Sequence, residues 1–152
     1  MNLPREFTAS VYVLDISRIY LIYHNKLAKW LPPGGHLEAN EAPHEAALRE
    51  CLEETGLHIE FIQNSSLDFF YPNAKTIPNP WLTLLEYIPP FKEKKAHEHV
   101  DFVYLAKPIE KKIEGSERGR WFNEKEINDL SSKEIFEDTK QTINQIFRTV
   151  SF

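Results

Sequence analysis

The most informative stretch of this chain of 152 residues is residues 35–57, GHLEANEAPHEAALRECLEETGL. The second half of the stretch predicts a helix from residue 41 to about residue 55, with Asn40 as its N-cap. Pro43 is tolerated in the first turn of such a helix, and Gly56 is a typical C-cap glycine. The stretch therefore predicts one central helix with defined ends.

Three glutamates share one side of this helix. At about 100° per residue, Glu53 and Glu54 lie near −60° and +40° from Glu50. The opposite side carries Leu48, Cys51, Leu52 and Thr55. Like charges at this spacing disfavour an isolated helix by roughly 0.2–0.5 kcal/mol per pair. The glutamates form either a solvated acidic surface or a cluster of hard oxygen ligands for a divalent cation such as Mg²⁺.

The segment before the helix favours the metal interpretation. Residues 30–36, WLPPGGH, place two adjacent glycines directly upstream of the helix. Adjacent glycines permit unusual backbone angles and let a backbone carbonyl or amide come close to a ligand. A turn alone could explain the pair, but backbone brought beside three carboxylates indicates a site.

The whole stretch resembles the signature of the Nudix hydrolases, G-x5-E-x7-R-E-U-x-E-E-x-G-U, in which U is a bulky aliphatic residue. The fixed positions are occupied by Gly35, Glu41, Arg49, Glu50, Glu53, Glu54 and Gly56. Cys51, at the first U position, is the one departure, and a buried cysteine behaves as a small hydrophobe. The resemblance implies an α/β (α+β) fold, a Nudix-like α/β/α sandwich with a mixed central sheet. We expect a single domain over residues 1–152.

The resemblance also implies an activity. Family members cleave a nucleoside diphosphate linked to another moiety, by water attack at phosphorus, with Mg²⁺ or Mn²⁺ as cofactor. The implied metal ligands are Glu50, Glu53, Glu54 and the carbonyl of Gly35. A salt bridge between Glu41 and Arg49 would orient the helix, which is a structural role that supports the site.

The general base is left open by the resemblance, because family members use either a glutamate of the signature or an acid from a later loop. Our first choice for this catalytic role is Glu53. Glu117, shortly before Trp121, is the later-loop candidate, and an ordinary loop charge is the other interpretation of Glu117.

A second group of polar residues lies further along the chain. His97, His99 and Asp101 alternate, so on a strand all three side chains point the same way. Such a row could contact substrate phosphate, assist proton transfer or bind a metal, although as a zinc site it lacks an evident fourth ligand. We expect these residues and His36 to bind substrate, with a polar sheet face or edge as the alternative.

The rest of the sequence is rich in strand patterns. The candidate strands are residues 7–14, 19–24, 57–62, 67–71, 81–87 and 100–106. A second helix is predicted over residues 132–149, with Ser131 and Glu134 at capping-box spacing. Strands interrupted by one helix and closed by another predict a mixed sheet with helices on its faces.

The charge of the chain is concentrated in the signature. The net charge is −5, and residues 35–57, with six glutamates and one arginine, account for all of it. A phosphate-rich partner should therefore bind at this segment only with divalent metal. The single cysteine excludes an intrachain disulfide, and the longest apolar run, residues 19–23, is too short to span a bilayer.

We therefore expect a cytoplasmic protein with no membrane partner and no DNA-binding domain, acting on a small-molecule nucleotide-type diphosphate. Homodimers are frequent in the family, and a homodimer is part of what the resemblance implies. Two alternatives stay open. One is a non-catalytic nucleotide-sensing protein of the same fold, and the other is a hydrolase of a non-nucleotide diphosphate.

Overall fold

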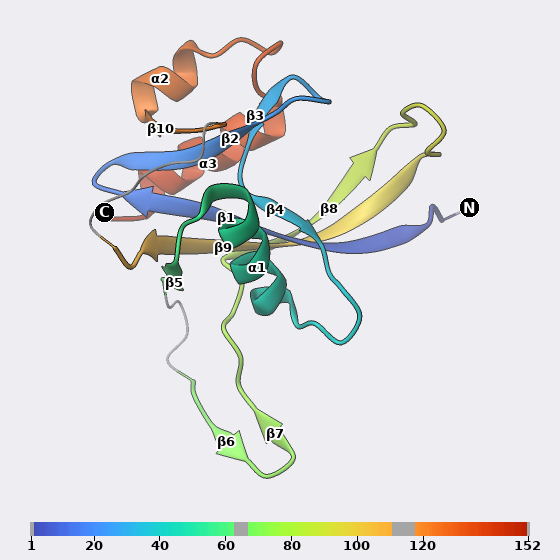
Figure 1. Cartoon of the computed structure of the whole chain (residues 1–152), viewed down its shortest axis with the longest axis vertical. Helices are drawn as coiled ribbons and strands as arrows, with labels where there is room; N and C mark the ends of the chain where they lie inside the picture. The colour runs from blue at the N-terminus through green and yellow to red at the C-terminus, as the bar shows by residue number, and fades with distance from the viewer. Residues whose placement is uncertain (1, 63–66, 111–117, 152) are drawn as a thin grey trace.

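The computed structural model describes residues 2–62, 67–110 and 118–151 (Figure 1). In chain order the elements are β1 (Arg5–Asp15), β2 (Arg18–His24), β3 (Lys29–Leu31), β4 (Gly34–His36), α1 (Pro43–Thr55), β5 (Ile59–Phe61), β6 (Phe70–Tyr71), β7 (Ala74–Lys75), β8 (Leu82–Ile88), β9 (His97–Pro108), β10 (Gly119–Asn123), α2 (Glu124–Asp129) and α3 (Glu137–Thr149). No helix in these described ranges is long and apolar enough to cross a membrane.

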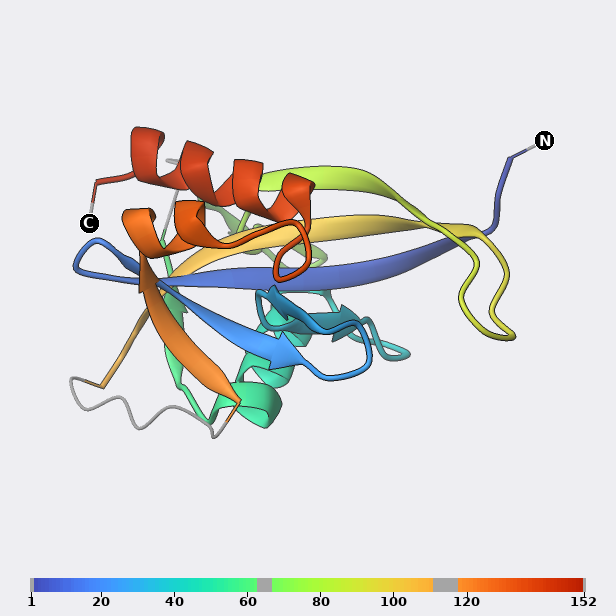
Figure 2. The same ribbon diagram turned by 90° about the horizontal axis from the view of Figure 1, so that it is seen from above.

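A large mixed sheet forms the middle of the molecule. Its strand order is β10-β2-β1-β9-β5, with β3 paired to β2, β4 to β1 and β8 to β9. The central pair β1 and β9 is parallel, whereas β8 runs antiparallel to β9. Figure 2 shows α1 on one side of this sheet and α2 and α3 on the other. The predicted sandwich with a mixed central sheet is confirmed.

Alternation along β1 builds a core on each side of the sheet. Val11 and Val13 belong to the core under α1, and Tyr12 and Leu14 belong to the core under α3. Successive side chains of a strand point to opposite faces, so one strand serves both layers. The long pairing of β1 with β9 is therefore the structural base of both helical layers.

The N-terminus of α1 differs from the prediction. The N-cap is Ala42, with extended backbone at φ −76° and ψ 155°, and Asn40 lies two residues earlier at φ 65°. The cause is Pro43, because a proline at the first helical position disfavours helical backbone in the residue before it. The predicted C-cap is confirmed, since Gly56 has φ 73° and donates its N–H to the Leu52 carbonyl at 2.9 Å.

The side of α1 that packs on the sheet also differs from the side that carries Leu48 and Leu52. Leu48 and Leu52 are 37% and 43% exposed. The helix instead buries Ala46, Ala47, Cys51 and Thr55. Small side chains let the helix lie close to the sheet, and this brings the margin of the glutamate face toward β4.

The second predicted helix is shorter than expected. Ser131 and Glu134 do pair, with the Ser131 N–H donating to Glu134 Oε2 at 2.8 Å. That pair closes a separate turn, and α3 begins only at Glu137. The short helix α2 was not predicted; it is capped by the Asn123 side chain, which accepts the Glu126 N–H at 2.9 Å.

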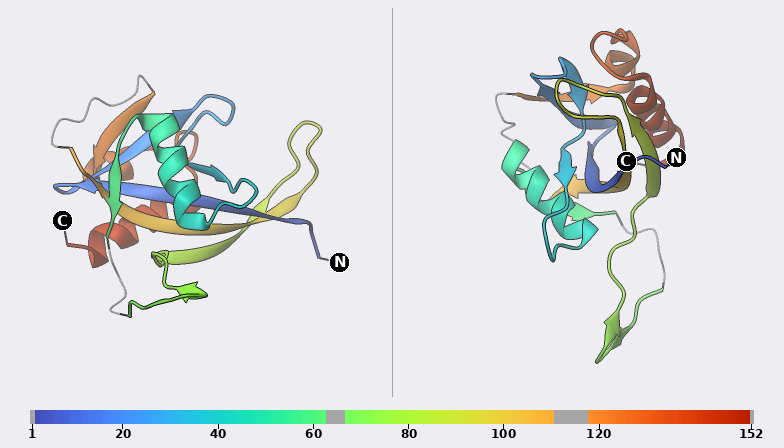
Figure 3. Two further views of the ribbon diagram at one scale, coloured as in Figure 1. Left: turned by 60° about the horizontal axis from the view of Figure 1, so that its bottom comes forward. Right: turned by 90° about the vertical axis from the view of Figure 1, so that its right-hand side faces the viewer.

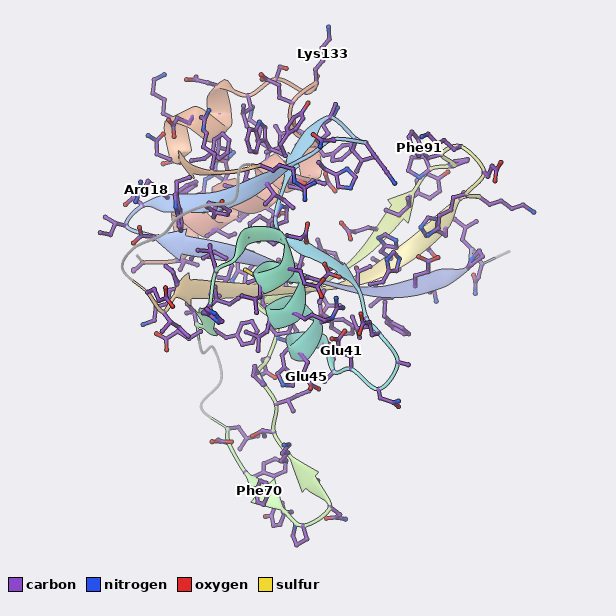
Figure 4. All side chains as sticks on the ribbon, viewed as in Figure 1. Arg18, Glu41, Glu45, Phe70, Phe91 and Lys133 are labelled. Atoms are coloured by element: carbon purple, nitrogen blue, oxygen red, sulfur yellow. The ribbon has the colours of Figure 1, made fainter. Side chains whose placement is uncertain are left out.

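The predicted strand over residues 67–71 is reduced to β6, which pairs only with β7. This hairpin stands away from the body in Figure 1 and in the right-hand view of Figure 3. Phe70, 81% exposed, lies on the hairpin in Figure 4. The hairpin is therefore an arm outside both cores.

Candidate active site

Arg49 is the centre of a polar network on α1. Its Nε and Nη2 donate to the two carboxylate oxygens of Glu41 at 2.7 and 2.9 Å. Its Nη1 donates to Glu50 at 2.9 Å and to Glu53 at 3.3 Å. Hydrogen bonding from the guanidinium keeps the pKa of Glu41 below its ordinary value. The expected contact between Glu41 and Arg49 is present, at the start of α1 where Figure 4 labels Glu41.

The glycines of β4 lie against the carboxylates of Glu50 and Glu54. The Gly34 N–H donates to Glu54 Oε1 at 2.9 Å. The Glu50 carboxylate lies against Gly35, so closely that a Cβ on Gly35 would come within 2.5 Å of Glu50 Oε1. Burial raises the pKa of Glu54 to about 7, with a further contribution from the neighbouring Glu50 charge. Ionising Glu54 places a second negative charge beside Glu50, an arrangement that a bound cation would stabilise.

This donor set fits a hard divalent cation. Glu50 and Glu54 lie together beside Gly34 and Gly35, where an added Cβ would not fit. Carboxylate and carbonyl oxygens are the ligands that Mg²⁺ prefers. Glu53 is more exposed, with 58% of its side chain accessible, and its carboxylate is held by Arg49. Glu117, the alternative base, lies outside the described residues.

The two glycines should respond differently to alanine. Gly35→Ala is expected to reduce turnover by about 10–100-fold, the size typical of disturbed ligand support, because the new Cβ displaces the Glu50 carboxylate. In Gly34→Ala the new Cβ would instead lie 2.5 Å from the backbone carbonyl oxygen of Ala9. This variant should therefore lose about 1–3 kcal/mol of unfolding free energy. Steady-state kinetics and urea unfolding of both variants check this; equal stability losses would contradict it.

The opposite face of the sheet carries the alternating polar row. His97, His99 and Asp101 all lie in β9 and point to the α3 side, as the period of two predicted. Asp101 is buried and accepts hydrogen bonds from Thr8 Oγ1 at 2.9 Å and Ser10 Oγ at 2.8 Å. The row therefore divides into a buried carboxylate and a pair of histidines.

A cavity of about 260 Å³ opens beside this row. Its lining includes Asp101, Glu86, Tyr12 and His36, and it reaches Gly34 and Gly35 at the carboxylate site. Burial raises the pKa of Glu86 to about 7, helped by the charges of Asp101 and Asp138. Glu86 was missed from the sequence, where its only signal was its inward position in an alternating strand.

Glu86→Gln should stabilise the protein at alkaline pH. Folded Glu86 keeps its proton up to about pH 7, while the unfolded side chain loses it near 4.5. This contribution to stability is present below pH 4.5 and is lost as the pH rises through 7. Gln does not titrate, so the variant should gain roughly 1–2 kcal/mol over wild type at pH 8 and nothing at pH 4, allowing for partial solvent screening. Urea unfolding across pH measures this, and an equal difference at both pH values would contradict it.

The fold and the carboxylate helix together define the class of Nudix hydrolases, enzymes that act on pyrophosphate bonds. The chain matches the NUDIX domain over residues 4–143, and it belongs to that family. The family resemblance of residues 35–57 is confirmed.

Individual relatives agree with this assignment. A probable DHNTP pyrophosphohydrolase from Lactococcus lactis subsp. cremoris is 30% identical over 117 residues, which is 77% of this chain and 63% of the relative. The chain thus spans less than two thirds of that protein. A crystal structure of a NUDIX-family hydrolase from Clostridium perfringens is 26% identical with a TM-score of 0.71, covering 98% of this chain and all of the other. The Ap4A hydrolase of C. elegans, 13% identical with a TM-score of 0.63 and covering 99% and 100% of the two chains, shares the fold.

Proposed function

We propose that this chain is a Mg²⁺-dependent pyrophosphohydrolase that cleaves a nucleotide-type diphosphate by water attack at phosphorus. The main support is the contact of Glu50 and Glu54 beside Gly34 and Gly35. Two adjacent, partly buried carboxylates would repel a pyrophosphate. A bound divalent cation supplies the missing positive charge and polarises the phosphorus centre.

We assign different roles to the residues in and around α1 and β4. Glu50, Glu53, Glu54 and the Gly35 carbonyl would hold Mg²⁺, or Mn²⁺ in its place. Arg49 would orient Glu50 and Glu53 through its Nη1 and is itself fixed by Glu41. Glu53, the most exposed of the three acids, would accept the proton of the attacking water, with Glu117 as the alternative base.

The cavity on the other face would take the organic part of the substrate. Glycines 34 and 35 border both the cavity and the carboxylates, so a ligand bound there can extend its phosphates toward Glu50. The carboxylate of Asp101, which lines the cavity, favours a heterocycle with adjacent N–H donors, such as the Watson–Crick edge of guanine. An adenine offers an acceptor at one of those positions and fits this carboxylate less well.

Product analysis on a panel of compounds tests this proposal. The panel would hold GTP, ATP, DHNTP, ADP-ribose and a dinucleoside polyphosphate, each with Mg²⁺. We expect cleavage at a pyrophosphate bond, with kcat/KM about tenfold or more in favour of guanine over adenine nucleotides, as one charged hydrogen bond implies. That preference should shrink in Asp101→Asn. It should persist in the control Thr83→Ala, because Thr83 lies on β8 but is exposed.

Equal use of guanine and adenine nucleotides would contradict the assignment of the cavity. Cleavage of no compound on the panel would contradict the enzymatic proposal. Binding without cleavage would favour the alternative of a nucleotide-sensing protein.

A further inference from the structure

Beyond the carboxylate site, side chains able to bind a metal gather on β1, β4 and β9. Figure 1 shows that β1 and β9 extend past the helices. Donor atoms of Glu6, His36 and His99 all lie within 4.8 Å of one another. Glu6 Oε2 is 2.5 Å from His36 Nε2, 3.6 Å from His99 Nε2 and 3.7 Å from His97 Nε2. One carboxylate oxygen therefore faces three imidazole nitrogens.

Strand pairing explains why residues so distant in sequence meet here. The parallel register of β1 and β9 places Glu6 beside His99, and β4 places His36 beside Thr8. Side chains of paired residues in neighbouring strands point to the same face. The cluster is thus built on three strands of the sheet.

His97 is oriented as a metal-binding histidine would be. Its Nδ1 lies 2.9 Å from the Lys95 carbonyl oxygen. Because a carbonyl only accepts hydrogen bonds, Nδ1 carries the proton and the Nε2 of the neutral ring has a free lone pair. That Nε2 lies 3.1 Å from His99 Nε2. Hydrogen bonding of the other ring nitrogen to a backbone carbonyl is typical of histidines that bind metals.

The separations suit a tetrahedral zinc ion. Bonds of about 2.0–2.1 Å to nitrogen and oxygen place neighbouring donors of a tetrahedron about 3.3–3.4 Å apart. The distances of 3.1, 3.6 and 3.7 Å among Glu6, His97 and His99 lie close to this value. The shorter pair of Glu6 and His36 has to open, and the His36 side chain, 52% exposed, has room to move.

We propose that Glu6, His36, His97 and His99 form a second metal site, for Zn²⁺ or a similar borderline divalent ion. Imidazole-rich donors suit zinc, copper and nickel, whereas carboxylate and carbonyl oxygens suit magnesium. Asp101, the third member of the alternating row, is not a ligand here, because Thr8 and Ser10 already hold it. Glu6 and His36 supply the two further ligands that His97 and His99 need for a four-coordinate site.

The site is chemically separate from the carboxylates of α1, although His36 directly follows Gly35. Gly35 lies against Glu50 on the α1 side, whereas the His36 ring packs edge-on to His99 on the other. Lys94 supplies a cation beside the cluster, its Nζ 3.2 Å from Glu6 Oε2. Since the Lys94 side chain is 55% exposed, a metal ion can replace its ammonium without disturbing a core.

Zinc titration of the metal-stripped full chain, in competition with a chromophoric chelator, tests this proposal. We expect one Zn²⁺ bound through this cluster, with binding at least about 10²-fold weaker in His99→Ala and in His36→Ala, because each loses an inner ligand. His36 is exposed, so its variant should fold even where His99→Ala does not. Co²⁺ should show the visible absorption of tetrahedral coordination in wild type and lose it in both variants.

Two further variants locate the ion. The double variant Glu50→Gln and Glu53→Gln should keep the zinc affinity of wild type, because it alters only the α1 carboxylates. Lys94→Ala should bind Zn²⁺ several-fold more tightly, because it removes the competing ammonium. The proposal is overturned if the histidine variants bind zinc as wild type does, if the double variant abolishes binding, or if Lys94→Ala leaves the affinity unchanged. None of these outcomes depends on the proposed pyrophosphohydrolase activity.

Discussion

Glu53→Gln is expected to lower kcat by about 10²-fold or more on the best substrate. The substitution removes the group proposed to accept the proton of the attacking water, and general acid–base groups contribute about 10²–10⁴-fold. Because 58% of this side chain is exposed, the unfolding free energy should change by less than about 0.5 kcal/mol. Steady-state kinetics beside urea unfolding separates the two effects.

The matched control is Glu38→Gln. Glu38 also faces Arg49 Nη1, at 3.6 Å, and is 68% exposed, yet it has no proposed chemical role. Its kcat should stay within about threefold of wild type, well short of the loss expected of an acid–base group. If Glu53→Gln were as active as Glu38→Gln, the base would have to be sought elsewhere, with Glu117 the next candidate.

Arg49→Ala should damage both stability and activity. Arg49 is 22% exposed and holds Glu41, 13% exposed, through two hydrogen bonds. Breaking a fully buried ion pair costs about 3–5 kcal/mol, so this partly exposed one should cost roughly 2–3 kcal/mol. Turnover should fall by about 10–100-fold, since Glu50 and Glu53 lose their orienting partner. Chemical unfolding and kinetics at saturating Mg²⁺ measure the two losses.

Arg148→Ala, at the exposed end of α3, is the control for removing an arginine. It should change the unfolding free energy by less than about 0.5 kcal/mol. Arg49→Lys should recover only part of the loss, because an ammonium cannot reproduce the planar contact with Glu41. Full recovery in Arg49→Lys would show that charge alone, and not the fork geometry, matters at this position.

Much of the α1 site could be predicted because its residues are close in sequence. A helix fixes the spacing of Arg49, Glu50 and Glu53, and Gly56 ends it through a positive φ that favours glycine. The direction in which the helix packs could not be predicted in the same way. Hydrophobicity ranks leucine above alanine, yet close approach to the sheet requires the smaller side chain, so Ala46 and Ala47 are buried and Leu52 is exposed.

The residues on the other face of the sheet show the opposite case. Glu6 has no local signal, and Glu86 has only its inward position in an alternating strand. Strand register places both of them beside His99. A shift of one residue in that register would turn these side chains to the α1 face. The alternation of His97, His99 and Asp101 predicted which face they share, but not which residues from other strands they meet.

The central claim is that the carboxylate face of α1 binds a divalent cation needed to hydrolyse a pyrophosphate bond. The most direct measurement follows hydrolysis of the best substrate by the purified chain with Mg²⁺, with excess chelator, and with Mg²⁺ in the double variant Glu50→Gln and Glu54→Gln. We predict cleavage at the pyrophosphate with Mg²⁺ and a loss of at least about 10³-fold in both other conditions. Undiminished cleavage in chelator, or by the double variant, would contradict the claim.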